Sequence, residues 1–423
     1  MKGVMESHTS ILKSKLTVSL IIFFAFVLSF RSWLCWRVNN HDTSVFIQRL
    51  TASGFDLKLV ESYSRYHKML VNLLTLQLAG YLSIDLILLV LGGLPWLARR
   101  LAFKNLEVVS TFSAALVMVL LRELLVTIIL LVFGYKLDPR LSLMGIRLAL
   151  IVQFLRAFTI YFGYRSLKKY FFPVLLLTYA LVMVLSSHFV VFALTSYLSP
   201  IDWSEGIGRL IRDLADKFGF PLQNVHIYDD NPWMPANAFY LGTLWTGYGT
   251  RILIHKKFLQ IFTSEQIYGF FAHELGHWNQ WYGVSFLWTS LPIYILASIV
   301  FSMLLYRQHI YKVAGFEVVK SEAAVSKNAG RLPYLPNPMQ FTLAFLSFYN
   351  VATEITNWYK NANSQIVEFQ ADAFAKGAGA GKELASGLMK GTEFGFVASM
   401  DSVVDTFLNT HPCVERRLKV LNV

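Results

Sequence analysis

The sequence predicts an α-helical membrane protein of about seven spanning helices that also carries a small folded unit of mixed α and β structure. The chain of 423 residues is 55% hydrophobic and 15% charged, whereas soluble domains carry roughly 25% charged residues. Several apolar runs reach the roughly 20 residues that cross a hydrocarbon core of about 30 Å. One long polar insert, residues 199–281, holds helix-like and strand-like patterns of its own.

The apolar runs place spans near residues 16–36, 73–98, 108–134, 141–164, 170–198, 283–305 and 340–360. The first run begins after Lys13 and Lys15, and no small-residue cleavage site follows it, so we expect a retained anchor rather than a cleaved signal peptide. A charged stretch from Asn39 to Asn72 separates the first two spans and is expected to be helical outside the membrane. We therefore divide the chain into a membrane bundle of about five helices, residues 1–198, and a second domain with two further spans, residues 199–423.

Ionisable side chains occur within the predicted spans: Asp85, Arg122, Glu123, Arg147, Arg156 and His188. A charged group that faces lipid is costly, so we expect these side chains to face the bundle interior or water. Any one of them could equally form a structural pair between helices, but together they favour a wet interior. The net charge of +12 is spread over short loops, which favours lipid headgroups rather than nucleic acid as the partner.

The polar insert predicts a small folded unit ahead of the sixth span. Apolar residues recur at helical spacing over Ser204 to Phe218, and Gly219 is a usual helix end. Asn224 to Tyr228 and Arg251 to Ile254 alternate polar and apolar residues like short strands. Thr263-Ser-Glu then offers caps for the helix that follows.

That helix carries the segment His273-Glu-Leu-Gly-His277. The two histidines are four residues apart, so their imidazoles project from one helix face and can hold one metal ion. Zinc accepts imidazole nitrogen, and a catalytic zinc site uses three protein ligands with a fourth position for water. Glu274 is placed to act on that water as a general base. The alternative is an exposed helix with two unrelated histidines, because short motifs also arise by chance.

A third ligand must come from elsewhere in the chain, and Glu368 is the best candidate. Glu368 and Asp372 are also four residues apart and share a helix face. Glu368 would bind the zinc, while Asp372 would accept an N–H from a ligand histidine. Without the first motif, this pair would be interpreted as two solvated acids.

These motifs resemble the integral-membrane CaaX prenyl proteases of type 1, which are zinc endopeptidases of the sterile-mutant type. Bacterial heat-shock membrane proteases are more distant relatives of that family. The resemblance is collinear and strong from about residue 200, over Ala236-Asn-Ala-Phe-Tyr240, His273-Glu-Leu-Gly-His277, Glu368-Phe-Gln-Ala-Asp-Ala-Phe-Ala-Lys376, and His411-Pro412 with Arg417. It implies about seven membrane helices that enclose a water-filled chamber, with a small gluzincin-like α+β zinc protease unit.

The resemblance implies that the zinc ligands are His273, His277 and Glu368. It also implies that Glu274 is the base and that the Asp372 carboxylate accepts a hydrogen bond from a ligand histidine. It adds His411 as a hydrogen-bond donor to the tetrahedral intermediate, although a loop histidine before Pro412 is the alternative. It also places Asn237 near the substrate backbone. Arg251 to Ile254 could pair with an extended substrate or be an ordinary edge strand. Arg417 could bind a substrate carboxylate or brace the fold, and we favour bracing.

The function that the resemblance implies is removal of the last three residues from a prenylated Cys-aliphatic-aliphatic-X tail, with one zinc ion per chain. The partners would be prenylated CaaX proteins and membrane lipid. The compartment would be the endoplasmic reticulum membrane, with the active site facing the cytosol, or the inner nuclear membrane. Prenyl length, a second cleavage near the substrate N-terminus and the oligomeric state stay open.

Four alternatives remain from the residues alone. One is a membrane quality-control protease of broad specificity, although the additional N-terminal spans argue against it. A second is a site-2-type intramembrane protease, which would need an Asp-Gly partner motif that the sequence does not offer. The others are a transporter or channel with an incidental motif, and a catalytically silent membrane binding protein, which would normally lack the base or a ligand.

Overall fold

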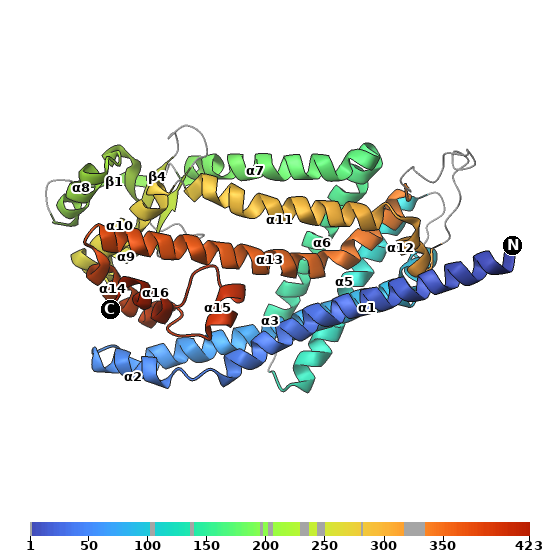
Figure 1. Cartoon of the computed structure of the whole chain (residues 1–423), viewed down its shortest axis with the longest axis horizontal. Helices are drawn as coiled ribbons and strands as arrows, with labels where there is room; N and C mark the ends of the chain where they lie inside the picture. The colour runs from blue at the N-terminus through green and yellow to red at the C-terminus, as the bar shows by residue number, and fades with distance from the viewer. Residues whose placement is uncertain are drawn as a thin grey trace. The chain divides into compact units, whose positions relative to one another are not determined.

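The computed structural model describes residues 2–101, 106–135, 139–194, 198–201, 206–228, 237–242, 250–280, 282–316 and 335–423. The chain is mostly helical with one small sheet, which confirms the predicted class (Figure 1). It forms two compact units, each built from three segments. The first unit comprises Met1–Cys35, Val71–Leu176 and Tyr294–Thr356, and the second comprises Trp36–Leu70, Leu177–Ile293 and Asn357–Val423.

Each predicted span lies on a helix of the structure. The long helices are α1 (Lys2–Asn40), α3 (Leu57–Val90), α5 (Glu107–Val132), α6 (Pro139–Leu167), α7 (Phe171–Leu194), α11 (Tyr282–Leu305) and α13 (Pro338–Gly377). The shorter ones between them are α2 (Ser44–Ala52), α4 (Gly93–Arg100), η1 (Lys168–Tyr170) and α12 (Gln308–Val313). Four segments of the described chain are long and apolar enough to cross a membrane: Lys15–Asn40, Leu57–Val90, Glu107–Val132 and Met144–Val182.

The second predicted span, residues 73–98, extends too far toward the C-terminus. Helix α3 ends at Val90, and Gly92 adopts a φ of 72° before α4 begins at Gly93. A positive φ is costly for residues with a side chain but not for glycine, so the chain breaks here although its residues remain apolar. At its other end, α3 continues back to Leu57. This part of α3, together with α2, forms the helical stretch that was expected between the first two spans.

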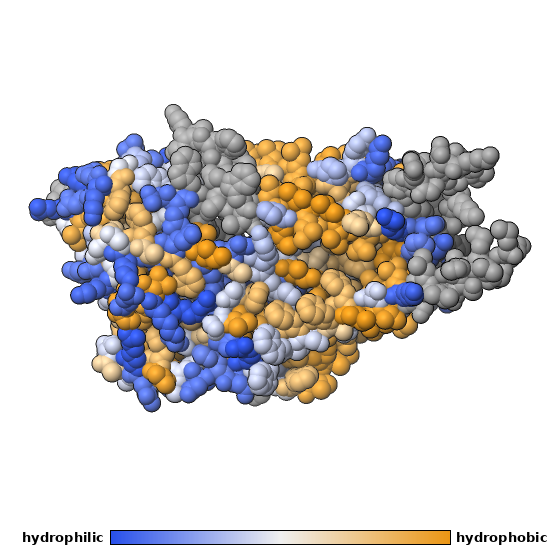
Figure 2. All heavy atoms as spheres, in the orientation of Figure 1, coloured by the Kyte–Doolittle hydropathy of each residue, from blue (hydrophilic) through white to orange (hydrophobic). Residues whose placement is uncertain are grey.

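Exposed apolar side chains cover the outer faces of the long helices, as lipid contact requires. Ile22 and Phe26 on α1 are 62% and 61% exposed, and Val132 at the end of α5 is 77% exposed. Leu148 and Leu155 on α6 are also exposed. Figure 2 shows hydrophobic side chains gathered over these helices. Continuous apolar surface of this extent marks a membrane-facing region rather than a solvated one.

Charged side chains of the first unit pair with one another in its interior. Asp85 is fully buried and accepts a 2.9 Å hydrogen bond from Nε of Arg122. Its other oxygen accepts a hydrogen bond from the Asn350 amide at 2.9 Å, and Arg122 also donates to the Leu346 carbonyl. Because every charge here has partners, the network can stay buried without facing lipid.

Other ionisable residues of the predicted spans differ in their surroundings. Glu123 accepts a hydrogen bond from the Tyr81 hydroxyl, and the Arg156 guanidinium lies 3.8 Å from the centre of the Tyr349 ring. These two residues therefore have partners within the unit, as expected. Arg147 is exposed, so of the two expected surroundings, the bundle interior and water, the interior does not apply to it. The side chain of His188 lies outside the described part of the structure.

The second unit contains the sheet and the short helices around it. The strands are β1 (Leu198–Pro200), β2 (Val225–Tyr228), β3 (Ala238–Leu241) and β4 (Arg251–His255), in the order β1-β2-β4-β3. Strands β2 and β4 are parallel, and the other two pairs are antiparallel. The helices are α8 (Gly206–Phe218), η3 (Leu222–Asn224), α9 (Lys256–Ile261), α10 (Ser264–Asn279), α14 (Gly381–Gly391), η5 (Thr392–Phe394), α15 (Ser402–Leu408) and α16 (Val414–Leu421).

This sheet confirms the two predicted strands and corrects one expectation. Arg251–His255 pairs with β2 along one side and with β3 along the other. It is therefore an internal strand and cannot pair with a substrate. Strand order depends on contacts between distant residues, so a local alternation of polar and apolar residues could not show it. Within the described chain, β3 lies at the edge of the sheet.

Helix α10 begins where the sequence predicts and packs into the core of the second unit. Thr263 and Gln266 form a capping box, in which each side chain accepts a hydrogen bond from the other's backbone N–H. Phe270 and Leu275 are buried with apolar residues of α14. This packing leaves the remaining face of α10 for the His-Glu motif.

The ion pair of the first unit gives a stability prediction. We expect Arg122→Met to lower the free energy of unfolding by about 3–5 kcal/mol, because it leaves the buried Asp85 carboxylate without its charge partner. The measurement is the thermal midpoint of the purified protein in detergent. Arg147→Met is the matched control, since it removes the same charge from an exposed position of α6. Equal thermal midpoints for the two variants would show that the pair of Asp85 and Arg122 contributes nothing to stability.

Candidate metal centre

The His-Glu motif lies on the buried face of α10. His273, Glu274 and His277 are 4%, 7% and 6% exposed. The two imidazole rings project from the same side of the helix, with their centres 4.7 Å apart. The spacing of four residues therefore gives the shared face that the sequence predicts.

A glycine brings a second helix against this face. Gly276 lies between the two histidines, and a Cβ atom built on it would stand 2.8 Å from Cα of Ala371 on α13. Such a distance is shorter than real Cβ contacts allow, so α10 and α13 can approach this closely only because residue 276 has no side chain. Ala371 lies between Glu368 and Asp372, and the contact therefore delivers both carboxylates to the histidines.

Glu368 completes a cluster of three side chains that can hold a metal ion. Its Oε2 atom lies 3.4 Å from Nε2 of His273, and its Oε1 atom lies 3.4 Å from Nε2 of His277. One candidate ligand atom from each residue lies within 4.8 Å of the other two, and all three residues are buried. These are the three ligands that the sequence predicts.

The donor set fits a zinc ion. Two ligand atoms at the usual zinc bond lengths of about 2.0–2.2 Å, set at a tetrahedral angle, lie roughly 3.3–3.5 Å apart, as the carboxylate and imidazole atoms do here. Oε2 of Glu368 is buried and accepts no hydrogen bond from any residue that the structure describes. A buried carboxylate oxygen without a donor is costly, and a bound cation would satisfy it.

Asp372 and Arg417 support the first histidine. The Asp372 carboxylate lies 2.9 Å from Nδ1 of His273, which leaves Nε2 for the metal. Arg417 donates to both oxygens of this carboxylate, from Nε at 2.9 Å and from Nη2 at 2.7 Å. Because the guanidinium is 8% exposed and holds Asp372 through two hydrogen bonds, its geometry is that of a brace rather than of a substrate-binding residue.

Burial and neighbouring charges shift the pKa values of the histidine and the carboxylates of this cluster in opposite directions. Burial and the Arg417 charge disfavour protonation of His273, but the neighbouring carboxylates of Asp372 and Glu368 outweigh them and raise its pKa to about 9. A metal ion must therefore displace a proton from this imidazole to bind it at neutral pH. Burial alone would raise the pKa of Glu368, yet His411 and the two ligand histidines hold it well below its usual value. Arg417 and His273 likewise hold the pKa of Asp372 below its usual value against the effect of burial. Glu368 and Asp372 are therefore both ionised at neutral pH, as metal binding requires of the ligand carboxylate.

Glu274 has the surroundings of a general base. Burial raises the pKa of its carboxyl above the usual value, against the opposing charges of His277 and His273. A base with a raised pKa takes and returns a proton more readily near neutral pH. The backbone of Tyr240 opposes this rise, and helix α10 packs against the edge strand β3 that carries Tyr240.

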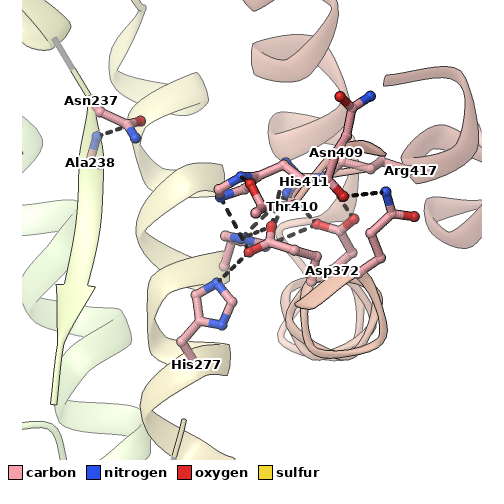
Figure 3. Close-up of polar contacts among 11 residues, drawn as sticks. Asn237, Ala238, His277, Asp372, Asn409, Thr410, His411 and Arg417 are labelled. Atoms are coloured by element: carbon pink, nitrogen blue, oxygen red, sulfur yellow. Dashed lines mark hydrogen bonds and ion pairs between the residues drawn. The ribbon is translucent and has the colours of Figure 1, made fainter. Parts of the chain in front are cut away.

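The structure brings His411 to the cluster and leaves Asn237 apart from it. Nε2 of His411 lies 3.5 Å from Oε1 of Glu368, while its side chain is 66% exposed. Asn237 lies at the start of β3, where its Oδ1 atom accepts from the N–H of Ala238 and its carbonyl accepts from the N–H of His255. Figure 3 shows this asparagine separated from the residues around His411 and Asp372.

Several residues at the site were not found from the sequence. Four such residues have contacts that fix the cluster or the loop of His411: Gly276, Gln365, Asp405 and Arg416. Gln365 precedes Glu368 by three residues and therefore shares its helix face, which is the only local signal among them. The contacts of Gly276 with Ala371 and of Gln365 with Asn409 join distant parts of the chain, and those of Asp405 span 8 and 11 residues without a repeating pattern.

Taken together, these features define the chain as a helical multi-pass membrane protein with a metallopeptidase centre. The profile of Peptidase family M48 matches residues 204–423, which is more than half of the chain. The chain belongs to this metallopeptidase family. The matched segment contains the histidines, both carboxylates, His411 and Arg417.

Curated proteins with similar sequences share this segment. The chain is 24% identical over 231 residues to "CAAX prenyl protease 1" of Saccharomyces cerevisiae, covering 53% of this chain and 49% of that protein. It is 25% identical over 214 residues to "Probable CAAX prenyl protease 1" of Schizosaccharomyces pombe, covering 50% and 41%. The chain thus spans about half the length of the curated relatives that it matches.

A solved structure extends the similarity to the whole fold. The crystal structure of S. mikatae Ste24p aligns with a TM-score of 0.63 at 18% identity, covering 96% of this chain and 98% of that chain. At this identity the alignment shows a shared fold. Because it covers 96% of this chain, it also extends over the N-terminal helices before residue 204, which lie outside the matched family segment.

The contact between α10 and α13 predicts the effect of one added methyl group. We expect Gly276→Ala to weaken zinc binding about 10- to 100-fold, the range for changes that misplace metal ligands, because the new Cβ would push Ala371 and hence Glu368 away. Competition with a fluorescent zinc chelator measures the affinity. Gly377→Ala is the matched control, since a Cβ there meets nothing within 4 Å. Unchanged affinity in Gly276→Ala would contradict the assignment of Glu368.

Proposed function

We propose that this protein is a zinc-dependent membrane endopeptidase that removes the C-terminal aaX tripeptide from prenylated CaaX proteins. The observation that carries the proposal is the convergence of His273, His277 and Glu368 on one point, with Glu274 beside it. The family match supports peptidase chemistry, and the names of the yeast relatives support the substrate class. We assign one zinc ion to each chain.

The bound zinc ion would polarise the scissile carbonyl and lower the pKa of the attacking water. Glu274 takes the proton from this water through its carboxylate oxygen. It then delivers the same proton to the nitrogen of the leaving amine, so that the C–N bond breaks and the base is restored. His411 donates a hydrogen bond from its imidazole to the oxygen that becomes negative in the tetrahedral intermediate.

The edge strand β3 is the proposed docking position for the substrate backbone. An extended peptide can add to an exposed sheet edge through main-chain hydrogen bonds, and β3 lies at such an edge in the described sheet. The packing of α10 against β3 supports a position of this strand beside the base. Asn237 at the start of β3 would meet one end of the bound peptide.

The apolar surface of the first unit supports a membrane setting for this reaction. A prenylated substrate is anchored to the bilayer, so a membrane-embedded enzyme and its substrate share one surface. We propose the endoplasmic reticulum membrane, with the site facing the cytosol, or the inner nuclear membrane. We also propose that about seven helices enclose a water-filled chamber above the site, with membrane lipid around them.

Replacing the base tests the chemistry. We expect Glu274→Gln to retain one zinc per chain and to lower kcat by a factor on the order of 10² or more, because the amide cannot accept the proton. Zinc content is measured by elemental analysis and cleavage by mass spectrometry of a farnesylated CaaX peptide. Cleavage by Glu274→Gln at the parent rate would exclude this residue as the base and favour a catalytically silent protein.

The prenyl group tests the substrate class. Purified parent protein is incubated with farnesylated and unfarnesylated forms of one CaaX peptide, each with and without a zinc chelator. We expect zinc-dependent release of the tripeptide from the farnesylated form only. Equal cleavage of both peptides would instead support a membrane protease of broad specificity.

A further inference from the structure

The loop that carries His411 is fixed by a buried hydrogen-bond network centred on Asp405. This residue lies on α15 and is fully buried. Its Oδ2 atom accepts from the backbone N–H of Cys413 at 3.0 Å and from Nη1 of Arg416 at 2.7 Å. Its Oδ1 atom accepts from the side chain of Asn409 at 2.8 Å. The carboxylate therefore joins both ends of the segment 409–413.

Gln365 ties this network to the helix that provides Glu368. Its side-chain amide donates to the backbone carbonyl of Asp405 at 2.5 Å and to that of Asn409 at 3.0 Å. Its oxygen accepts from Nη1 of Arg416 at 2.7 Å. Gln365 is 1% exposed, and its bond to the Asp405 carbonyl is buried, whereas its bonds to Asn409 and Arg416 are partly buried.

Gln365 and the candidate metal ligand Glu368 lie on the same face of α13. Residues three apart on a helix share one face, and Gln365 stands three residues before Glu368. The same short stretch of α13 thus holds both the carboxylate and the loop. His411 itself is largely exposed, and its imidazole contacts Glu368 at 3.5 Å and the hydroxyl of the adjacent Thr410 at 3.1 Å. Because Thr410 belongs to the same loop, the place of the imidazole depends on how the loop is held.

We propose that Gln365 is a positioning residue, which sets the place of the His411 imidazole relative to Glu368 by binding the carbonyls of Asp405 and Asn409. The inference rests on the proposed peptidase function, in which His411 meets the developing oxyanion. A displacement of about 1 Å can lower a rate by a factor on the order of 10². The chemical step depends on Gln365 for this reason, although Gln365 does not touch the substrate.

The first test compares Gln365→Met with Asn363→Met. Methionine keeps the length of the glutamine side chain without its hydrogen bonds. Asn363 lies on the same helix and donates only to its own helix, to the Tyr359 carbonyl, among the bonds that the structure describes. We expect Gln365→Met to lower kcat by about 10- to 100-fold with KM and zinc content unchanged, and Asn363→Met to match the parent.

A double-mutant cycle separates positioning from a general structural effect. If Gln365 acts through His411, then Gln365→Met should lower kcat by less than about twofold in a protein that already carries His411→Ala, because residues that act as a unit are not additive. If each substitution instead lowers kcat by its own independent factor, so that the double variant shows the product of the two, the proposal is overturned. Arg416→Met provides the second variant if Gln365→Met does not fold, since it removes the bonds to Gln365 and Asp405 together.

Hydrogen exchange gives a readout that does not depend on activity. Backbone amides of residues 409–413 should exchange faster in Gln365→Met than in the parent and in Asn363→Met, because the network no longer holds the loop. Equal exchange in all three proteins would overturn the proposal whatever the kinetics. If the parent cleaves no peptide, the proposed function fails, while faster exchange in Gln365→Met would still show that this residue fixes the loop.

Discussion

The metal centre depends on the close approach of α10 and α13 at Gly276 and Ala371. Each helix alone presents two polar side chains on one face, which is an ordinary surface pattern. Because Gly276 has no side chain, the two helix backbones can meet. The two histidines of α10 and the two carboxylates of α13 then form one buried cluster. Core packing of α10 against α14 and the capping box at Thr263 hold the first helix in place. The ligands, the base and the outer carboxylate all derive their positions from this one contact.

The charges of the cluster explain why a dication suits it. Glu274, Glu368 and Asp372 are three buried carboxylates, and Arg417 is the one guanidinium buried with them among the described residues. With neutral imidazoles the site carries two net negative charges, which is costly at low dielectric. Protonation of His273, whose pKa is raised to about 9, offsets part of this charge. A zinc ion would offset all of it and would also bind the buried oxygen of Glu368.

Local patterns were sufficient to predict much of this molecule. The spacing of the histidines and of Glu368 and Asp372 gave the two helix faces, and Thr263 gave the start of α10. Hydropathy missed the break at Gly92 because the residues around it are apolar and only the backbone angle changes. The internal position of Arg251–His255 and the bonds of Gln365 to Asp405 and Asn409 join segments that are distant in sequence. No local pattern records such contacts, so they appear only in the folded chain.

The zinc K-edge X-ray absorption spectrum of the purified protein tests the assembled site most directly. The account predicts one zinc ion per chain in a first shell of nitrogen and oxygen only, with the scattering of two imidazoles, and loss of the ordered first shell in Glu368→Ala. Bond lengths of about 2.0–2.2 Å are expected for this donor set. A first shell containing sulfur, or a spectrum that does not change in Glu368→Ala, would contradict the convergence of His273, His277 and Glu368 on one ion.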